Sequence, residues 1–344
     1  MMPSFDNTQM PLVSVCIANY NGMAVIDDCL SSVLEQEGHI PVEILVHDDA
    51  SSDGSVTYIR DRYPDVKLIE STGNVGFCVA NNRMAAEAKG EYLLLLNNDA
   101  ALYSDALQTL LAEAKRLRQP AILSLPQYDA TSGNLIDIGC LLDPFCNPVP
   151  NSKHERNDVA MVIGACLWIP KALWNELEGF PEWFDSIGED LYICSRARLA
   201  GYPVRALCMS GYRHHVGQSF GGGKIANGEL ATTFRRRALS ERNKTFVMAT
   251  TFPTPVAALL LPLHLALLVL EGTLLSLLKL DSRYLRRIYL PVFGALFQRR
   301  HELRAARAAA QTNRLLASGD FFAAFDRWPH KLRMLIRHGL PRLK

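Results

Sequence analysis

The sequence predicts an α/β protein with a mostly parallel sheet flanked by helices. Short apolar runs at residues 12–18, 42–46, 66–69 and 92–96 alternate with stretches of helical pattern, as strands joined by crossover helices do. The run at 92–96 is apolar throughout, which is typical of a strand buried on both faces of a parallel sheet. A chain of 344 residues has room for one such domain and an additional segment.

Turn and capping residues place the remaining elements between and after these strands. In the first hundred residues the expected helices are 23–36, the segment from the caps at 51–53 to 63, and 77–88. Residues 120–150 are rich in Gly, Pro and Asn and predict loops with short strands. Beyond them the sequence predicts two strands and two helices, at 162–169, 202–207, 171–178 and 188–200.

A polar cluster follows each of the first four strands. The clusters are Asn19-Tyr20-Asn21, Asp48-Asp49, Gly73-Asn74 and Asn97-Asn98-Asp99. Because the carboxyl ends of parallel strands meet at one edge of a sheet, where ligands bind, we expect these groups to share one rim. Each cluster alone is also ordinary turn chemistry. Four on one edge favour a binding site, and a carboxylate beside amide oxygens suits a divalent cation that holds phosphates.

These motifs, taken in order, resemble the family 2 glycosyltransferases, which use nucleotide-diphosphate sugars and have the Rossmann-like GT-A fold. The matching pieces are residues 13–21, 46–53, 74–77 and 95–99, then Gly188-Glu189-Asp190 and His214-His215-Val216-Gly217-Gln218-Ser219. The Asn-Asn-Asp form and the His-His segment are most similar to the branch that contains bacterial rhamnosyltransferases of surface polysaccharides. The resemblance covers about residues 12–219.

The resemblance implies a UDP-sugar or dTDP-sugar donor. Asp49 would accept a hydrogen bond from the pyrimidine N3–H, in a base pocket lined by the region around Tyr20. The remaining expected nucleotide-binding residues are all amides at the strand ends: Asn19, Asn74, Asn97 and Asn98.

The resemblance also implies a divalent metal, Mn²⁺ or Mg²⁺. Asp99, as the last residue of the family's Asp-x-Asp motif, would bind it together with His214 or His215; the spacing to Ser219 favours His214. Imidazole accepts Mn²⁺ better than Mg²⁺. Either histidine is alternatively a packed side chain. Asn97 stands where the family often has Asp, and fewer carboxylates should weaken metal binding.

Glu189 and Asp190 lie at the N-terminus of a predicted helix, where carboxylates are stabilised by the helix dipole even as plain caps. The resemblance makes Asp190 the general base that deprotonates the acceptor hydroxyl, and it makes Glu189 the residue that positions this base or touches the acceptor. Direct displacement with one base inverts the anomeric centre.

The expected function is therefore an inverting, metal-dependent glycosyltransferase with rhamnose as the candidate sugar. Its acceptor would be a lipid-linked or growing polysaccharide, and no nucleic-acid partner is expected. Two alternatives remain. One is a nucleotidyltransferase-type nucleotide-sugar enzyme, which the Glu189-Asp190 pair disfavours. The other is a catalytically silent GT-A scaffold, which Asn97 favours and the intact Asp49, Asp99 and Asp190 oppose.

The C-terminal part differs in charge and hydropathy. Residues 281–344 hold 14 Lys or Arg against 4 Asp or Glu, whereas the whole chain has a net charge of +1. Residues 245–270 contain no charged side chain but are interrupted by three prolines. A single crossing would place the basic tail outside, against the positive-inside rule. We expect a catalytic domain at 1–244 and a helical, membrane-associating region at 245–344, monotopic or re-entrant, with a buried pair of core helices as the alternative.

Three further features bear on location and on the loops. The eight cysteines form no CxxC pair, which favours free thiols in a reducing compartment. Without a secretory pattern near residue 1, the expected location is cytoplasmic, on the inner face of the cell membrane. The glycine-rich segment 221–224 is a candidate lid over the diphosphate. The basic segment 235–237 is a candidate cluster for binding diphosphate or lipid headgroups, and alternatively a solvated face.

Overall fold

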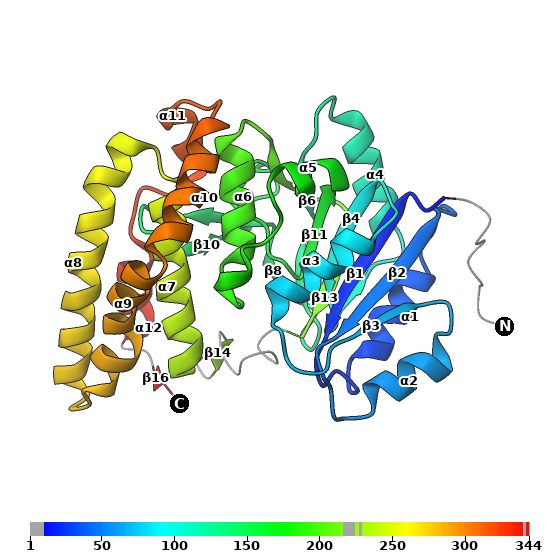
Figure 1. Ribbon diagram of the computed structural model, residues 1–344, viewed down its shortest axis with the longest axis horizontal. Coiled ribbons are helices and arrows are strands. Elements are labelled where there is room, and N and C mark those ends of the chain that lie inside the picture. The colour runs from blue at the N-terminus through cyan, green and yellow to red at the C-terminus, as the bar shows by residue number, and fades with distance from the viewer. Residues whose placement is uncertain (1–9, 216–223, 227–228, 340–341, 344) are drawn as a thin grey trace. The chain divides into compact units, whose positions relative to one another are not determined.

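The computed structural model of the chain describes residues 10–215, 224–226, 229–339 and 342–343 (Figure 1). The expected lid at 221–223 and the end of the His-His segment, 216–219, lie outside these residues. Contacts divide the chain into two compact units. Unit 1 comprises Met1–Cys140, Pro150–Ser186 and Tyr202–His215; unit 2 comprises Leu141–Val149, Ile187–Gly201 and Val216–Lys344. These units are defined by packing. The boundary expected at 244/245 separates a catalytic from a membrane-associating region, so the packing does not test it and it stays a prediction.

Unit 1 is built on a seven-stranded sheet in the order β12-β6-β11-β4-β1-β2-β3. The four N-terminal strands are neighbours and run parallel, as predicted, whereas β11 is antiparallel to both β4 and β6. The strands are β1 (Val13–Asn19), β2 (Val42–Asp48), β3 (Lys67–Glu70), β4 (Tyr92–Asn97), β6 (Ile122–Ser124), β11 (Cys166–Pro170) and β12 (Val204–Ala206).

Helices and a second sheet complete unit 1. Its helices are α1 (Ile26–Leu34), α2 (Ser55–Arg62), α3 (Phe77–Glu87), α4 (Ala106–Arg116), α5 (Lys171–Glu176) and the 3₁₀ turn η1 (Glu182–Phe184). The second sheet has the order β5-β13-β7-β8, with β5 (Ala100–Leu102), β7 (Gln127–Asp129), β8 (Leu135–Asp137) and β13 (Tyr212–His214). A separate pair is formed by β9 (Cys140–Leu142) and β10 (Pro148–Pro150), and most residues of these two strands belong to unit 2. Short strands at 120–150 therefore confirm the loop-and-strand prediction.

The core of unit 1 explains why these segments become strands. Val15, Ile17, Leu94 and Leu96 are almost completely buried, and Trp168 of β11 packs in the same cluster. Burial of apolar surface on both faces of the sheet is the main source of its stability. All eight cysteines are free, and seven of them are buried.

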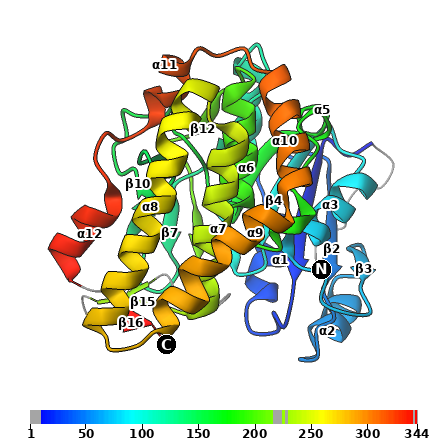
Figure 2. The ribbon, with the colours of Figure 1, turned by 60° about the vertical axis from the view of Figure 1, so that its left-hand side comes forward.

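Unit 2 is mainly helical. Its helices are α6 (Glu189–Leu199), α7 (Phe234–Thr251), α8 (Thr254–Leu278), the π-helical turn η2 (Leu285–Tyr289), α9 (Leu290–Gln298), α10 (Arg300–Thr312), α11 (Ser318–Phe321), the 3₁₀ turn η3 (Phe322–Ala324) and α12 (His330–His338). Three short strands pair with one another: β14 (Lys224–Ala226), β15 (Glu229–Thr232) and β16 (Arg342–Leu343). Helix α7 packs against α6, α8, α9, α10 and η2, so it forms the centre of this unit (Figure 2).

Helix α8 corresponds to the long uncharged segment of the sequence. It runs unbroken through Pro262, with Pro255 in its first turn, where a missing N–H costs nothing. Among the described residues it is the one helix long and apolar enough to cross a membrane, and only 22% of its apolar window is buried. In this structure α8 is therefore not a mostly buried core helix, although its inner face is packed.

Candidate functional site

The four polar clusters after β1 to β4 lie along one rim of the main sheet, as predicted. The register pairs Asn19 with Asp48 and Ala18 with Asn97, so these strands end at the same level. Hydrogen bonds then link the clusters: Asn98 Nδ2 donates to Asn19 Oδ1 at 2.9 Å, and Asn19 Nδ2 donates to an Asp48 carboxylate oxygen at 2.8 Å. Hydrogen bonds thus connect the clusters that follow β1, β2 and β4.

Asn19 is the centre of this connection rather than an exposed group. It is only 1% exposed, and its amide also donates to Ser55 Oγ at 3.0 Å. Gly22 is required beside it, since a Cβ at that position would lie 2.1 Å from Asn19 Oδ1 and 2.4 Å from Asn98 Nδ2. These contacts make Asn19 a link between strand ends, and its direct contact with a nucleotide stays a prediction.

Asp49 holds the loop that follows β3. Its two carboxylate oxygens accept from the backbone N–H groups of Val75 at 2.6 Å and Gly76 at 2.9 Å. Asp49 is buried, whereas Tyr20 and Asn74 are exposed beside it on the loops of the rim. A carboxylate oxygen has two acceptor positions, so these bonds leave Asp49 able to accept from a nucleobase as well.

Asp99 and His214 meet although 115 positions separate them in the sequence. Strand β13 pairs with β5 so that His214 lies opposite Ala100, the residue after Asp99. His214 Nε2 then lies 3.1 Å from Asp99 Oδ1, and both side chains are buried. The backbone N–H of His215 donates to the Asp99 carbonyl at 3.0 Å, while its side chain is half-buried. The structure therefore brings Asp99 and His214 together, as expected of two ligands of one metal.

The donor set fits a cation that is shared with a phosphate ligand. Asp99 supplies a carboxylate and His214 an imidazole, and both are ligands that Mn²⁺ accepts. Among the described residues there is no group of three or more His, Cys, Asp or Glu that could hold a metal alone. Asn97, where an Asp would add a ligand, is half-buried at the end of β4. A cation here would complete its coordination with phosphate oxygens, as Mg²⁺ and Mn²⁺ commonly do.

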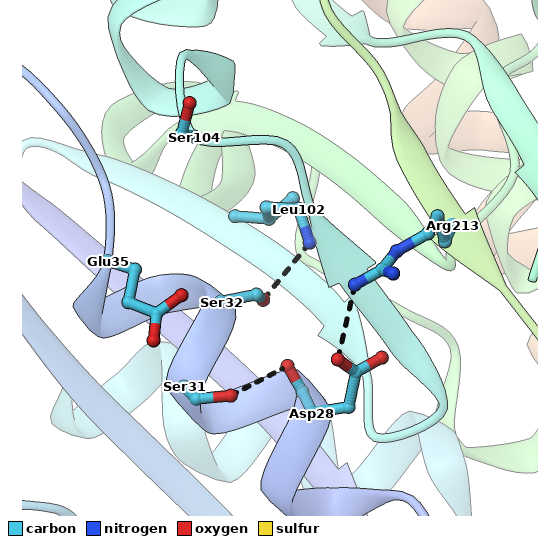
Figure 3. Close-up of a pocket in the computed structure, with 7 residues that line it drawn as sticks. All are labelled: Asp28, Ser31, Ser32, Glu35, Leu102, Ser104 and Arg213. Atoms are coloured by element: carbon cyan, nitrogen blue, oxygen red, sulfur yellow. Dashed lines mark hydrogen bonds and ion pairs between the residues drawn. The ribbon is translucent and has the colours of Figure 1, made fainter.

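A small pocket in unit 1 is lined by other residues (Figure 3). Its lining comes from α1, β5 and β13 and consists of Asp28, Ser31, Ser32, Glu35, Leu102, Ser104 and Arg213. Arg213, its one cation, is paired with Asp28 at 3.2 Å. The pocket contains none of the predicted site residues, and its two acidic groups do not suit a diphosphate.

Glu189 and Asp190 begin α6 in unit 2, after a strained turn. Ile187 and Gly188 have positive φ angles of 69° and 92°, and such a conformation is costly for a β-branched residue. Asn243 of α7 donates to the Ile187 carbonyl at 2.7 Å and so holds the turn. Backbone strain of this kind is found most often at functional sites, which agrees with the role expected of this pair.

Glu189 is not a plain helix cap. It is 6% exposed, and its Oε2 has no hydrogen-bond partner among the described residues. Burial, together with the negative charge of Asp190, raises the pKa of Glu189 to about 8, although Arg236 opposes the rise. A carboxyl group with so high a pKa is neutral at pH 7. Perturbed carboxyl groups of this kind mark candidate catalytic sites.

Two further residues, Asn243 and Arg236, interact with this turn and its carboxylates, and only Arg236 belongs to a segment that the sequence singles out. Asn243 has no local signature, because an amide within a helix is unremarkable on its own. Arg236 was part of the basic cluster 235–237, and the negative charges of Asp190 and Glu189 act on its guanidinium. The alternative of a solvated basic face fails for Arg237, which pairs with Glu241 at 3.0 Å and Glu271 at 2.8 Å.

Comparison with known proteins agrees with this geometry. The rim of unit 1 and the parallel strands define a fold of the GT-A class. Residues 14–171 match the sequence model of the family "Glycosyl transferase family 2". Residues 14–171, just under half of the chain, are therefore similar in sequence to glycosyl transferase family 2.

Two curated relatives and one solved structure illustrate the similarity. A chondroitin synthase of Escherichia coli is 29% identical over 189 residues, which is 54% of this chain and 26% of that protein. The N-acetylglucosaminyl-diphospho-decaprenol L-rhamnosyltransferase of Mycobacterium tuberculosis is 26% identical over 211 residues, 53% of this chain and 69% of that protein. The chain spans about a third or less of the length of several relatives that it matches.

The solved structure is a mannosyltransferase from Pyrobaculum calidifontis in complex with GDP-Man and Mn²⁺. It superposes with a TM-score of 0.50 at 19% identity, covering 90% of this chain and 88% of that one. At this identity the similarity concerns the fold alone, and it confirms the predicted GT-A architecture.

Proposed function

We propose that the protein is an inverting, metal-dependent glycosyltransferase that moves a sugar from a nucleoside diphosphate to a lipid-linked or polysaccharide acceptor. The observation that carries the proposal is the buried Asp99–His214 pair at the rim of the sheet. It supplies a carboxylate and an imidazole where a parallel sheet binds its ligand. The related rhamnosyltransferase makes rhamnose, from a dTDP or UDP donor, the first sugar to test.

Each strand end would contribute to holding the donor. Asp49, together with Tyr20 and Asn74, would contact the base, and Asn97 and Asn98 would lie near the diphosphate. Asp99 and His214 would hold a divalent cation, with His215 as the less favoured ligand. When bound, that cation would neutralise the charge that develops on the leaving nucleoside diphosphate.

Asp190 would take the proton from the acceptor hydroxyl. The hydroxyl oxygen then forms the new bond to the anomeric carbon while the bond to the diphosphate breaks on the opposite face, so the configuration inverts. Glu189, which is neutral at pH 7, would accept or donate a hydrogen bond to the acceptor without adding a second negative charge.

We also propose that the protein acts at the cytoplasmic face of the cell membrane, with residues 1–244 as the catalytic region and 245–344 as the membrane-associating region. The exposed apolar helix α8 and the basic composition beyond residue 281 support this location. A lipid-linked acceptor would be reached at the same surface.

Nucleotide release from a panel of UDP-, dTDP- and GDP-sugars, with Mn²⁺, Mg²⁺ or EDTA and a membrane lipid extract, tests the reaction. Asp99→Ala should abolish metal-dependent donor binding, and Asp190→Asn should keep donor binding but lose transfer. Asp61→Ala, on the exposed surface of α2, is the matched control.

The outcomes separate the proposal from its alternatives. Normal turnover in the Asp190→Asn variant would remove the base assignment, and unchanged calorimetric affinity with Mn²⁺ in the Asp99→Ala variant would remove the metal ligand. A wild-type chain that binds no donor would favour the silent scaffold. Pyrophosphate-dependent formation of a nucleotide sugar would favour a nucleotidyltransferase.

A further inference from the structure

Helix α8 presents one continuous apolar face to its surroundings. Six of its large exposed side chains recur at intervals of three or four residues, which places them on one side of the helix; they are Leu259, Leu263, Leu267, Leu270, Leu274 and Leu277. Val269 and Leu278, next to two of them in the sequence, are exposed as well. The helix has 25 residues and is about 37 Å long. Figures 1 and 2 show α8 on the outside of the helical unit. A face of this size and composition marks an interaction surface.

The opposite face of α8 is packed against its own unit. Leu268 and Leu275 are buried in a cluster with Tyr289, and a Cβ at Gly272 would lie 2.7 Å from the Tyr289 ring. His264 is 2% exposed and lies 2.8 Å from Thr245 Oγ1 of α7. Burial lowers the pKa of His264 to about 3, so its ring is neutral.

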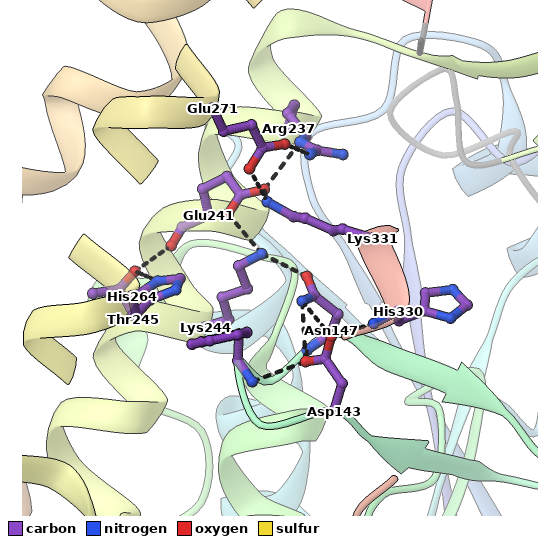
Figure 4. A network of polar contacts seen from close by, with 11 residues as sticks. Asp143, Asn147, Arg237, Glu241, Lys244, Thr245, His264, Glu271, His330 and Lys331 are labelled. Atoms are coloured by element: carbon purple, nitrogen blue, oxygen red, sulfur yellow. Dashed lines mark hydrogen bonds and ion pairs between the residues drawn. The ribbon is translucent and has the colours of Figure 1, made fainter. Parts of the chain in front are cut away.

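Ion pairs fix α8 to α7 and α12 near the C-terminal end of the helix (Figure 4). Glu271 of α8 pairs with Arg237 of α7 at 2.8 Å and with Lys331 of α12 at 2.6 Å. Lys331 also pairs, at 2.7 Å, with Glu241, which is 1% exposed. Burial alone would raise the pKa of Glu271, but Lys331 and Arg237 outweigh it and keep this carboxylate ionised.

The same network continues away from α8. Lys244 pairs with Glu241 at 2.6 Å and donates to Asn147 Oδ1 at 2.7 Å, and Asn147 Nδ2 donates to Asp143. Glu271 of α8 therefore binds Arg237 and Lys331 directly, and it is linked to Glu241 through Lys331.

This anchoring decides how α8 can meet a bilayer. If α8 crossed the hydrocarbon core, either the ion pairs of Glu271 would break or Arg237, Glu241 and Lys331 would enter the core with it. Both are costly, because charges are poorly tolerated there. If α8 lies parallel to the surface, its outer face enters the lipid while its inner face keeps every contact.

We propose that α8 lies in the plane of an anionic phospholipid bilayer, with its leucine face in the boundary between headgroups and acyl chains. Such in-plane helices bind through buried apolar area combined with attraction to anionic lipids. The segment after α8 supplies the cations: Lys279, Arg286 and Arg287 are exposed. A second copy of the chain is a less suitable occupant, because it would bring the same cations close to one another. The inference rests on the proposed membrane location but not on the proposed reaction.

Vesicle co-sedimentation of the full chain tests the surface, with vesicles of phosphatidylcholine alone and of phosphatidylcholine with phosphatidylglycerol. Leu270→Asp/Leu274→Asp should lower binding to the anionic vesicles at least tenfold. Met10→Asp/Met209→Asp is the matched control, because it adds the same charge at two exposed positions of unit 1. Thermal unfolding should be unchanged in both variants, since all four side chains are exposed.

Three other results of the vesicle experiment would each contradict a particular part of the proposal. Wild-type binding by the leucine variant would overturn the α8 surface while leaving a membrane location through the basic residues. No binding by the wild-type chain would overturn both, and the transfer assay would still judge the enzyme. If the wild-type chain is a dimer, and the leucine variant is a monomer that still binds vesicles, the leucine face of α8 binds a second copy of the chain and the proposal is wrong.

Depth measurements separate the in-plane helix from a spanning one. Single spin labels at Leu259→Cys, Leu267→Cys and Leu277→Cys, in a Cys208→Ser background, would report depth through collisions with oxygen and a nickel chelate. Cys208 is the one exposed native thiol. The proposal expects equal, shallow depths at all three positions. A deepest value at position 267 would show that α8 spans the bilayer and would overturn it.

Discussion

Replacing Glu189 with glutamine should change the pH dependence of stability. In the folded chain, burial raises the pKa of Glu189 from 4.5 to about 8, whereas in the unfolded chain the carboxyl group is exposed and ordinary. A raised pKa means that Glu189 contributes its full stability below pH 4.5 and loses it progressively as the pH rises to 8. Glutamine has no proton to lose, so the variant lacks this dependence.

The magnitude follows from the linkage between proton binding and folding. Each pKa unit corresponds to about 1.4 kcal/mol. Between pH 5 and pH 7 the unfolded state releases the Glu189 proton and the folded state keeps it. The wild-type free energy of unfolding should therefore fall by about 2.5 kcal/mol more than that of Glu189→Gln over this range.

Urea unfolding of both proteins at pH 5, 6 and 7 measures this difference. Any constant effect of the amide, such as a changed hydrogen bond, cancels because only the change with pH is compared. Glu182→Gln is the matched control, since Glu182 is exposed and its variant should follow the wild type. A gap between wild type and Glu189→Gln that stays the same at all three pH values would show that Glu189 titrates normally, and the argument from burial would be wrong.

Three further changes test the rim, the metal pair and the ion network. Gly22→Ala should lower the free energy of unfolding by about 2 kcal/mol, because its methyl group would collide with Asn19; urea unfolding with no loss would contradict this. His214→Gln should weaken Mn²⁺-dependent donor binding at least tenfold by calorimetry, and unchanged affinity would remove His214 as a ligand. Glu241→Gln should destabilise the chain by about 3 kcal/mol, because three cations would lose their buried partner; a loss below about 1 kcal/mol would show that they find other partners.

The rim of the sheet could be predicted from the sequence because both the apolar run of a buried strand and the polar residues that end it are local patterns. The apolar run at 92–96 identifies a central strand, and Asn97 to Asp99 break it abruptly. Strand direction then places all four clusters on one edge without any knowledge of distant contacts. The antiparallel direction of β11 was not accessible in this way, because an apolar run carries no sign of its orientation. Helix α4 was not predicted, although Leu107, Leu110 and Leu111 recur at helical spacing.

The partners of the site residues depended on contacts that no local pattern records. His214 reaches Asp99 only because β13 pairs with β5, and the family resemblance, not the periodicity, linked the two. Asn243 holds the turn before Glu189 from another helix. The ion network joins Glu241, Glu271 and Lys331, whose spacings of 30 and 60 residues follow no repeat. Burial, which decides the pKa of Glu189, is likewise a property of the packed unit.

Helix α7 connects the turn before Glu189 with helix α8. On one side Asn243 holds the Ile187 carbonyl next to the predicted base, and on the other side Arg237 and Glu241 hold Glu271 of α8 through direct and Lys331-mediated ion pairs. A buried, fully paired network is rigid, because breaking one member leaves another charge unpaired. The distance between the Glu189–Asp190 turn and the leucine face of α8 is therefore set by one helix. An acceptor anchored in a bilayer needs its reactive hydroxyl at a constant height above the lipid, which is what such a connection supplies. The proposed membrane position of α8 therefore gives a reason to test lipid-linked acceptors before free sugars.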